Sequence, residues 1–235
     1  MNIFIQNCFM NDGYNSQQKS TKKLKNPIKF SVSLNEEQKE AKSYILQNKI
    51  TVLKGQAGSG KSMVAAQVAL DMLFRKEVER IILTRPAITS GEELGFLPGD
   101  KDAKLAPYTA AIYDNMYRLY SKDKIDKEIM EGNIEVIPLA FMRGRNLTNC
   151  CVVVDEAQNI TSAQMELMLG RLCIGSKMIL CGDTAQIDLK DRKSSGFKFI
   201  CDNFASVTGF GVFTLKTNHR DPIVEEILKV YDNFR

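Results

Sequence analysis

The sequence predicts an α/β fold in which helices cover both faces of a mostly parallel central sheet. Short β-branched apolar segments, typical of buried strands, alternate along the 235 residues with longer segments of helical periodicity. Several of the apolar segments are followed directly by glycine-rich or acidic residues. Because open parallel sheets bind ligands at the carboxyl ends of their strands, we expect the chemistry just after residues 54, 84, 154, 181 and 215.

The helices are predicted from their periodicity and their capping residues. Asn35 caps the first helix, and Glu36 and Glu37 in its first turn complement the helix dipole. Thr161 and Gln164 have the spacing of a capping box at the start of another helix. These signals predict helices at residues 35–48, 61–74, 107–120, 161–172 and 223–231. The apolar segments predict strands at residues 50–54, 80–84, 134–137, 151–154, 178–181 and 211–215.

The chain is predicted to consist of an N-terminal basic, flexible extension, residues 1–29, and a single folded domain, residues 30–235. From Asn11 to Lys29 the extension is rich in Asn, Gln, Ser and Lys and has a single acid, Asp12. Two interpretations stay open: a solvated tail, or a basic arm that contacts phosphates or a neighbouring subunit. The net charge of +4 permits a nucleic-acid partner without indicating one.

Composition favours a soluble, cytoplasmic protein. None of the six cysteines belongs to a Cys-x-x-Cys pair, which favours buried, reduced thiols over a disulfide framework or a zinc site. The apolar start of the chain lacks the basic lead of a signal peptide. No apolar run reaches the roughly 18 residues that a membrane-spanning helix needs. We therefore expect no association with a membrane.

The strongest motif follows the first predicted strand. Residues 55–62 match the phosphate-binding pattern G-x-x-x-x-G-K-[ST], with a strand before them and an amphipathic helix after them. The glycines let backbone N–H groups wrap a phosphate at the positive end of that helix. We expect Lys61 to contact the β- and γ-phosphates of ATP and Ser62 to bind Mg²⁺. The predicted nucleotide contacts in this loop are Gly55, Gln56, Ala57, Gly58, Ser59, Gly60, Lys61, Ser62 and Met63.

Two carboxylates follow the buried strand at residues 151–154. We expect Asp155 to hold Mg²⁺, directly or through water, and Glu156 to orient and deprotonate the attacking water. An Asp-Glu pair after a strand carries little weight alone, but downstream of a phosphate loop it completes a hydrolytic site. The expected fold is therefore a RecA-like P-loop NTPase, and the expected cofactors are ATP and Mg²⁺.

Three further segments resemble motifs of superfamily 1 helicases. Residues 34–38 are similar to the element whose glutamine, here Gln38, reads adenine. Residues 182–186 resemble the motif whose glutamine, here Gln186, senses the γ-phosphate. Residues 215–220 resemble the motif that carries an arginine, here Arg220, toward the same phosphate. With the two motifs above, this resemblance implies a catalytic set of Lys61, Asp155, Glu156, Gln186 and Arg220.

A more specific resemblance runs from about residue 34 to residue 231. The chain resembles the PhoH family of P-loop ATPases in residues 85–87, 91–100, 138–147, 155–159 and 182–189. It departs from the family at Gly170, which precedes Arg171 where threonine is usual. It departs again at residues 217–220, where Thr-Asn-His-Arg replaces Asp-Val-Val-Arg and changes the setting of Arg220. The resemblance implies an ATPase that forms rings and, in some members, acts on RNA.

The chain ends at Arg235, soon after Arg220, so we expect no second lobe of the kind that closes the ATP site of two-domain helicases. We expect a homo-oligomer instead, most simply a hexameric ring, whose basic residues complete a neighbour's site. Candidate nucleic-acid or interface residues are Arg85, Arg143, Arg145 and Arg171. An internal salt bridge for Arg85 and a solvated loop for Arg143 and Arg145 stay open. Arg220 could act within its own subunit or in the next one.

The leading function is an ATPase that moves along or remodels single-stranded RNA or DNA in a helicase-like way. An ATP-switched ring that binds or remodels a protein partner is the first alternative, and a ribonuclease-associated ATPase is the second. The sequence has no visible four-carboxylate nuclease cluster. A small-molecule kinase is disfavoured because it has no need of the Asp155-Glu156 and 182–186 motifs together. A GTPase is disfavoured because no Asn-Lys-x-Asp segment exists to read guanine.

Overall fold

The computed structural model describes residues 28–86 and 113–232 of the chain. Most of the predicted N-terminal extension and the family signature at residues 91–100 therefore lie outside the described residues, and the domain boundary near residue 30 stays a prediction. The helix expected at residues 107–120 is described only from residue 113, and residues 113–119 are helical.

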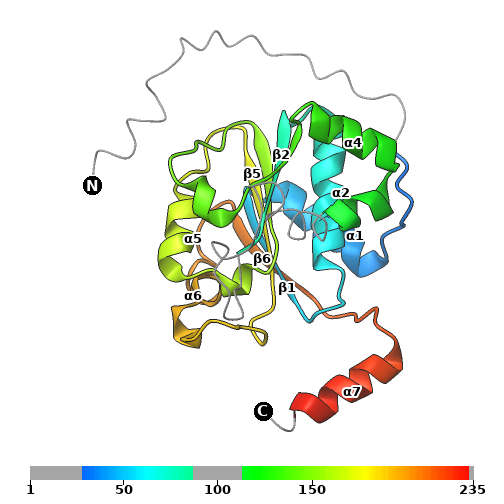
Figure 1. Ribbon diagram of the computed structural model, residues 1–235. Helices are drawn as coiled ribbons and strands as arrows, with labels where there is room; N and C mark the ends of the chain where they lie inside the picture. Colours follow the sequence, from blue (N-terminus) through cyan, green and yellow to red (C-terminus); the bar gives the residue numbers. More distant parts are fainter. Residues whose placement is uncertain (1–27, 87–112, 233–235) are drawn as a thin grey trace, which may run out of the picture.

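The described strands form one parallel sheet of six strands in the order β3-β2-β4-β5-β1-β6 (Figure 1). The strands are β1 (Ile50–Gly55), β2 (Arg80–Thr84), β3 (Ile134–Val136), β4 (Cys150–Val154), β5 (Lys177–Gly182) and β6 (Phe210–Leu215). The prediction of an α/β fold with a parallel sheet is confirmed. Each predicted strand is present, with ends that differ by one residue at most.

Helices cover both faces of this sheet. The covering helices are α1 (Glu36–Gln47), α2 (Lys61–Phe74), α4 (Lys122–Met130), α5 (Ser162–Leu169) and α6 (Gly196–Asn203). A further helix, α7 (Pro222–Asp232), extends away from the sheet. Figure 1 shows α1, α2 and α4 on one side of the sheet, and α5 and α6 on the other. None of the described helices is long and apolar enough to cross a bilayer.

The two-residue period of the strands builds two separate hydrophobic cores. In β2, Ile81 and Leu83 pack with α1, α2 and α4, whereas Ile82 packs on the opposite face with α5 and α6. β4 alternates in the same way, with Val153 in the first core and Val152 in the second. A strand that is buried on both faces needs apolar residues at every position, which is why these segments read as continuous apolar runs.

Two helix starts were predicted from their caps, and both caps are present. Asn35 and Gln38 form a reciprocal capping box at α1, and Thr161 and Gln164 form another at α5. The predicted end of the helix at residues 161–172 was wrong, because this helix, α5, stops at Leu169. Gly170 follows that end, and a single turn then leads to a bridge between Leu147 and Leu172.

The parallel sheet brings four loops to the same edge. The phosphate loop follows β1, Asp155 follows β4, Asp183 follows β5, and residues 216–220 follow β6. Because β4, β5, β1 and β6 are consecutive neighbours in the sheet, these loops lie next to one another. This is the edge at which the sequence predicted the chemistry.

Candidate functional site

The phosphate loop has the backbone that an anion cradle needs. Gly58 and Gly60 have φ angles of +91° and +84°, which residues with a Cβ rarely adopt. Gly60 is the N-cap of α2 and no side chain caps the helix, so the first-turn N–H groups have no partner of that kind. The ammonium of Lys61 donates to the carbonyls of Gly55 (2.7 Å) and Gln56 (2.8 Å), so the lysine lies along the loop. This arrangement fits a bound triphosphate.

The two predicted metal ligands lie in contact. Ser62 Oγ donates a hydrogen bond of 2.6 Å to Asp155 Oδ1, across the gap between α2 and the end of β4. A hydroxyl and a carboxylate form an all-oxygen set, which is the chemistry that Mg²⁺ prefers, with water and phosphate oxygens as its remaining ligands. The residues present therefore fit a magnesium ion held beside the phosphate loop.

Glu156 occupies a strained backbone position. Its φ angle of +50° lies in the left-handed region, which is unusual for a residue other than Gly, Asn or Asp. Gln158 Nε2 donates to Glu156 Oε2 at 2.6 Å, and the Arg85 guanidinium lies 3.6 Å from the other carboxylate oxygen. Both contacts fix the direction of the carboxylate. The salt bridge that the sequence left open for Arg85 is thus present, and its partner is the predicted base.

Gln158 links the ends of two strands, a role that the sequence did not reveal. The residue is only 1% exposed, and its side-chain Oε1 accepts the N–H of Asp183 at 3.1 Å. Its backbone carbonyl accepts the hydroxyl of Ser195 at 2.7 Å. The glutamine therefore ties the carboxylate loop after β4 to the loop after β5.

The loop after β5 turns Gln186 toward the same site. Asp183 Oδ1 accepts the N–H of Ala185 at 2.9 Å, and the Asp183 carbonyl accepts the N–H of Gln186 at 3.1 Å. Asn159 and Asp188 tie the loop to the segment after β4, since Asn159 Oδ1 accepts the Asp188 N–H at 2.7 Å. The exposed side chain of Gln186 lines the pocket described below.

Arg220 lies against the phosphate loop of its own chain. The backbone N–H of His219 donates to the Gly58 carbonyl at 3.0 Å. A Cβ built on Gly58 would lie 2.7 Å from Arg220 Cγ and 2.7 Å from Asn218 Oδ1, so the two segments are in close contact. The geometry thus brings Arg220 to the site within one subunit.

The described residues enclose a cavity of about 480 Å³ at this edge of the sheet. Residues that the sequence predicted line most of it: Ala57, Gly58, Gly60, Lys61, Ser62, Met63, Asp155, Glu156, Gln186 and Arg220. Further lining residues were not predicted: Val32, Asn115, Arg118, Gln158, Cys181, Gly182 and Asp183. Asp183 and Gln158 could have been found from the motifs around them. Val32, Asn115 and Arg118 reach the cavity through tertiary packing and carry no motif.

Burial and charge act in opposite directions on Lys61. Burial is the largest cause and lowers the pKa of its ammonium, while the nearby acidic groups, among them Asp183, Glu156 and Asp155, raise it. The adjacent thiol of Cys181 is buried, and burial raises its pKa well above the usual value. Cys181 is therefore a neutral thiol beside Lys61, and the surroundings of the lysine lower the pKa of its ammonium overall.

Gln38 lies behind the phosphate loop. It is 3% exposed, its side chain belongs to the α1 capping box, and its Nε2 lies 3.2 Å from His219 Nε2. A Cβ on Gly60 would lie 2.6 Å from Gln38 Nε2, so the glutamine packs directly on the loop. It is not among the described residues that line the cavity.

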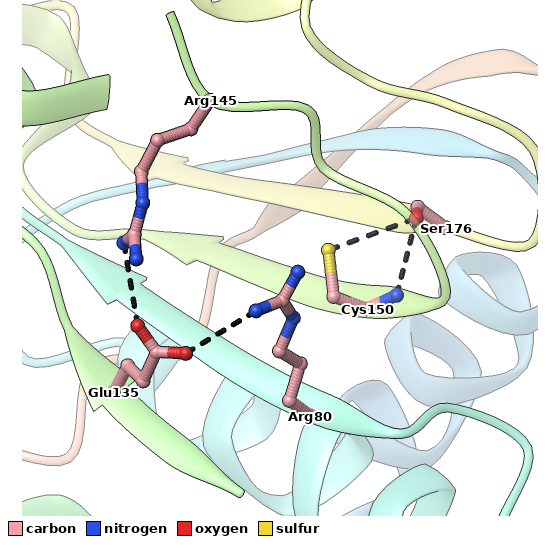
Figure 2. A network of polar contacts seen from close by, with 5 residues as sticks. All are labelled: Arg80, Glu135, Arg145, Cys150 and Ser176. Carbon is pink, nitrogen blue, oxygen red and sulfur yellow. Dashed lines mark hydrogen bonds and ion pairs between the residues drawn. The ribbon is translucent and has the colours of Figure 1, made fainter. Parts of the chain in front are cut away.

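The candidate nucleic-acid arginines differ in their surroundings. Arg143 is exposed, and Gly144 after it bends the chain with a φ of +84°. Arg145 is engaged, because its guanidinium donates to Glu135 on β3, which also binds Arg80 on β2 (Figure 2). Arg171 is half-buried just after the end of α5.

Comparison with known proteins identifies the relatives of this chain. A family described as PhoH-like protein matches residues 32–232. A PhoH-like protein of Synechocystis sp. is 43% identical over 190 residues, which cover 80% of this chain and 58% of the relative. A PhoH-like protein of Bacillus subtilis is 40% identical over 197 residues, covering 83% of this chain and 62% of the relative. The chain therefore spans less than two thirds of these curated relatives.

Solved structures with this fold include two bacteriophage proteins. The UvsW helicase of bacteriophage T4 has a TM-score of 0.50 at 16% identity, covering 78% of this chain and 60% of that one. The large terminase of a thermophilic bacteriophage has a TM-score of 0.52 at 9% identity, covering 84% of this chain and 50% of that one. These similarities confirm the RecA-like fold. The family match over residues 32–232 and the identities to its curated members show that the chain belongs to the PhoH family.

Proposed function

We propose that the chain is a Mg²⁺-dependent ATPase. One observation carries this proposal: Lys61, the Ser62–Asp155 pair and Glu156 line one cavity at the carboxyl edge of the sheet. Phosphoryl transfer to water needs little more from a protein than positioning and charge. The pocket offers a cationic loop, a hard-metal ligand pair and a carboxylate base within reach of one another.

Each residue has a separate task in this proposal. Bound Mg²⁺-ATP supplies the electrophilic γ-phosphorus and the positive charge that offsets its oxygens. Lys61 would exchange its carbonyl partners for phosphate oxygens, and Ser62 and Asp155 would hold the ion. Glu156 accepts a proton from the attacking water, and Gln158 and Arg85 keep its carboxylate oriented.

Arg220 and Gln186 are proposed to act on the γ-phosphate from opposite sides of the loop. Arg220 belongs to the same chain as the Gly58 that it contacts, which favours action in cis. An arginine that stabilises the transferred phosphoryl group is worth about 10³–10⁵ in rate. Gln38 stays a proposed adenine contact from its family resemblance, although a base would have to compete with the contacts that the glutamine already makes.

We further propose that ATP hydrolysis is coupled to movement along, or remodelling of, single-stranded RNA or DNA. Arg143 is exposed, and the side chain of Arg145 is 46% exposed although its guanidinium pairs with Glu135, which supports a phosphate-backbone contact. The T4 relative of this fold is named a helicase, in keeping with such a partner. Replacing both arginines by alanine is expected to leave ATP affinity unchanged and to weaken nucleic-acid binding with a shallower salt dependence. If the double variant bound RNA and DNA with unchanged affinity, Arg143 and Arg145 would not be nucleic-acid contacts.

A homo-oligomer, most simply a hexameric ring, is part of the proposal. Ile223, Ile227 and Val230 lie at helical spacing on α7 and are 62%, 49% and 56% exposed, which supports a second copy as their partner. Figure 1 shows α7 extending away from the sheet. Light scattering should give a multiple of the chain mass, and Ile227→Glu should shift it toward the monomer. A wild-type monomer with full turnover on dilution would contradict the ring.

The deciding experiment is an ATPase assay on purified chain of known oligomeric state. Phosphate release should require Mg²⁺ and should rise when RNA or single-stranded DNA is added. Absence of stimulation by either nucleic acid, with basal hydrolysis intact, would favour a ring with a protein partner. Absence of ATP binding would overturn the proposal itself.

A further inference from the structure

A reciprocal hydrogen-bond pair fixes the orientation of two amide side chains at the start of α1. Asn35 Oδ1 accepts the N–H of Gln38 at 2.8 Å, and Gln38 Oε1 accepts the N–H of Asn35 at 3.1 Å. A backbone N–H can only donate, so each amide must present its oxygen to the backbone. The NH₂ group of each side chain must then point the other way.

Both NH₂ groups point at the same atom, Nε2 of His219. The distances are 3.2 Å from Asn35 Nδ2 and 3.2 Å from Gln38 Nε2. Because both partners are donors, Nε2 has to be the acceptor, and the ring has to be neutral with its proton on Nδ1. The capping box therefore determines the tautomer of a histidine that is remote from it in the sequence.

The same histidine holds the segment that carries Arg220. Its backbone N–H donates to the carbonyl of Gly58 at 3.0 Å, and Arg220 Cγ lies beside that glycine. Upstream, the carboxylate of Glu37 accepts the N–H groups of Lys216 (2.7 Å) and Thr217 (3.0 Å). Hydrogen bonds from Thr217 and Lys216 are the main causes that lower the pKa of Glu37. Residues 216–220 are thus attached on one side to α1 and on the other to the phosphate loop.

We propose that neutral His219 is a positioning residue, anchored by Asn35 and Gln38, that holds Arg220 over the phosphate loop. The catalytic consequence rests on the proposed function, because it requires Arg220 to act on the γ-phosphate. The tautomer does not rest on it.

The tautomer can be measured directly, because His219 is the one histidine of the 235-residue sequence. With ¹⁵N-labelled histidine, a single pair of ring nitrogen signals needs no assignment. At mildly alkaline pH we expect a protonated Nδ1 and an acceptor-type Nε2. Asn35→Asp, which keeps the cap but replaces one donor by a carboxylate, should shift the proton toward Nε2. A wild-type ring protonated on Nε2, or exchanging like free imidazole, would overturn the anchor.

Turnover tests the consequence of the anchor. His219→Leu removes the acceptor and should lower kcat at least about tenfold with little change in KM, as expected for loss of a contact used in the transition state. In His219→Gln, the amide oxygen of the new side chain can accept from the same donors. This variant should recover most of the lost kcat and should have the melting temperature of the wild type. Equal kcat for His219→Leu and wild type would refute the positioning role. An inactive wild type would instead refute the proposed function, and the tautomer would still decide whether the anchor exists.

Discussion

The contact between Arg220 and the phosphate loop predicts a specific effect of Gly58→Ala. Gly58 has a φ of +91°, and its missing side chain leaves room for Arg220 Cγ and Asn218 Oδ1, each 2.7 Å from the place of a Cβ. An alanine here carries two penalties. Its backbone is strained, and its methyl group overlaps the segment that carries Arg220.

A matched variant separates the two penalties. Gly132 has a φ of +73° in the turn before β3, and a Cβ there would meet nothing within 4 Å. The left-handed backbone costs an alanine about 1–2 kcal/mol at either position. For a domain of this size, that corresponds to a drop in Tm of about 2–4 °C per kcal/mol. Gly132→Ala should show this loss of stability alone.

The rate of hydrolysis measures the second penalty. Full loss of the arginine is worth about 10³–10⁵, so a displaced Arg220 should lower kcat at least about tenfold in Gly58→Ala. Gly132→Ala should remain within about twofold of wild type, since its turn lies at the amino ends of the strands. If the two variants lost the same stability and both kept wild-type kcat, the docking of Arg220 on the loop would be refuted.

Three further predictions follow from single contacts. Lys61→Ala should abolish both tight ATP binding and turnover, as measured by nucleotide titration and phosphate release; retained affinity would contradict its phosphate contact. Glu156→Gln should keep ATP affinity and lower kcat by about 10²–10⁴, and normal turnover would exclude Glu156 as the base. Burial raises the pKa of Asp71, but hydrogen bonds from Lys42 and Arg75 outweigh it, so the folded pKa is lowered. The ionised Asp71 therefore makes its full contribution to the free energy of unfolding at pH values above its unfolded-state pKa of about 3.9. This contribution is lost as the pH falls through the pKa of Asp71 in the folded state. In thermal melts, Asp71→Asn should remove this acid dependence of Tm. If the pH profile of Tm were the same in the variant and the wild type, the ion pairs of Asp71 with Lys42 and Arg75 would contribute nothing to stability.

The strands and the main motifs could be predicted because their signals are local. A strand buried on both faces is a continuous apolar run, as in β4, and the phosphate loop is one contiguous pattern. Two helices, α4 and α6, were missed, and each has a physical reason. α4 is mostly charged and buries only Ile125. α6 begins at Gly196, which is required because a Cβ would lie 2.6 Å from Met165 on α5.

The parts of the site that the sequence missed depend on contacts between distant segments. Arg118 and Val32 line the cavity because their segments pack beside α2, and nothing in their local sequence indicates it. The tie from Gln158 to Asp183 exists only because β4 and β5 are neighbours. The anchor of His219 joins the start of α1 to the loop after β6, and no local pattern encodes that pairing.

The most direct test of the central claim is a crystal structure of the chain with a non-hydrolysable ATP analogue and Mg²⁺. We predict a triphosphate wrapped by the N–H groups of residues 55–62, an ion bound by Ser62 and Asp155, and Glu156 facing the γ-phosphate. A nucleotide bound elsewhere, or a filled loop with both carboxylates turned away from it, would contradict the account.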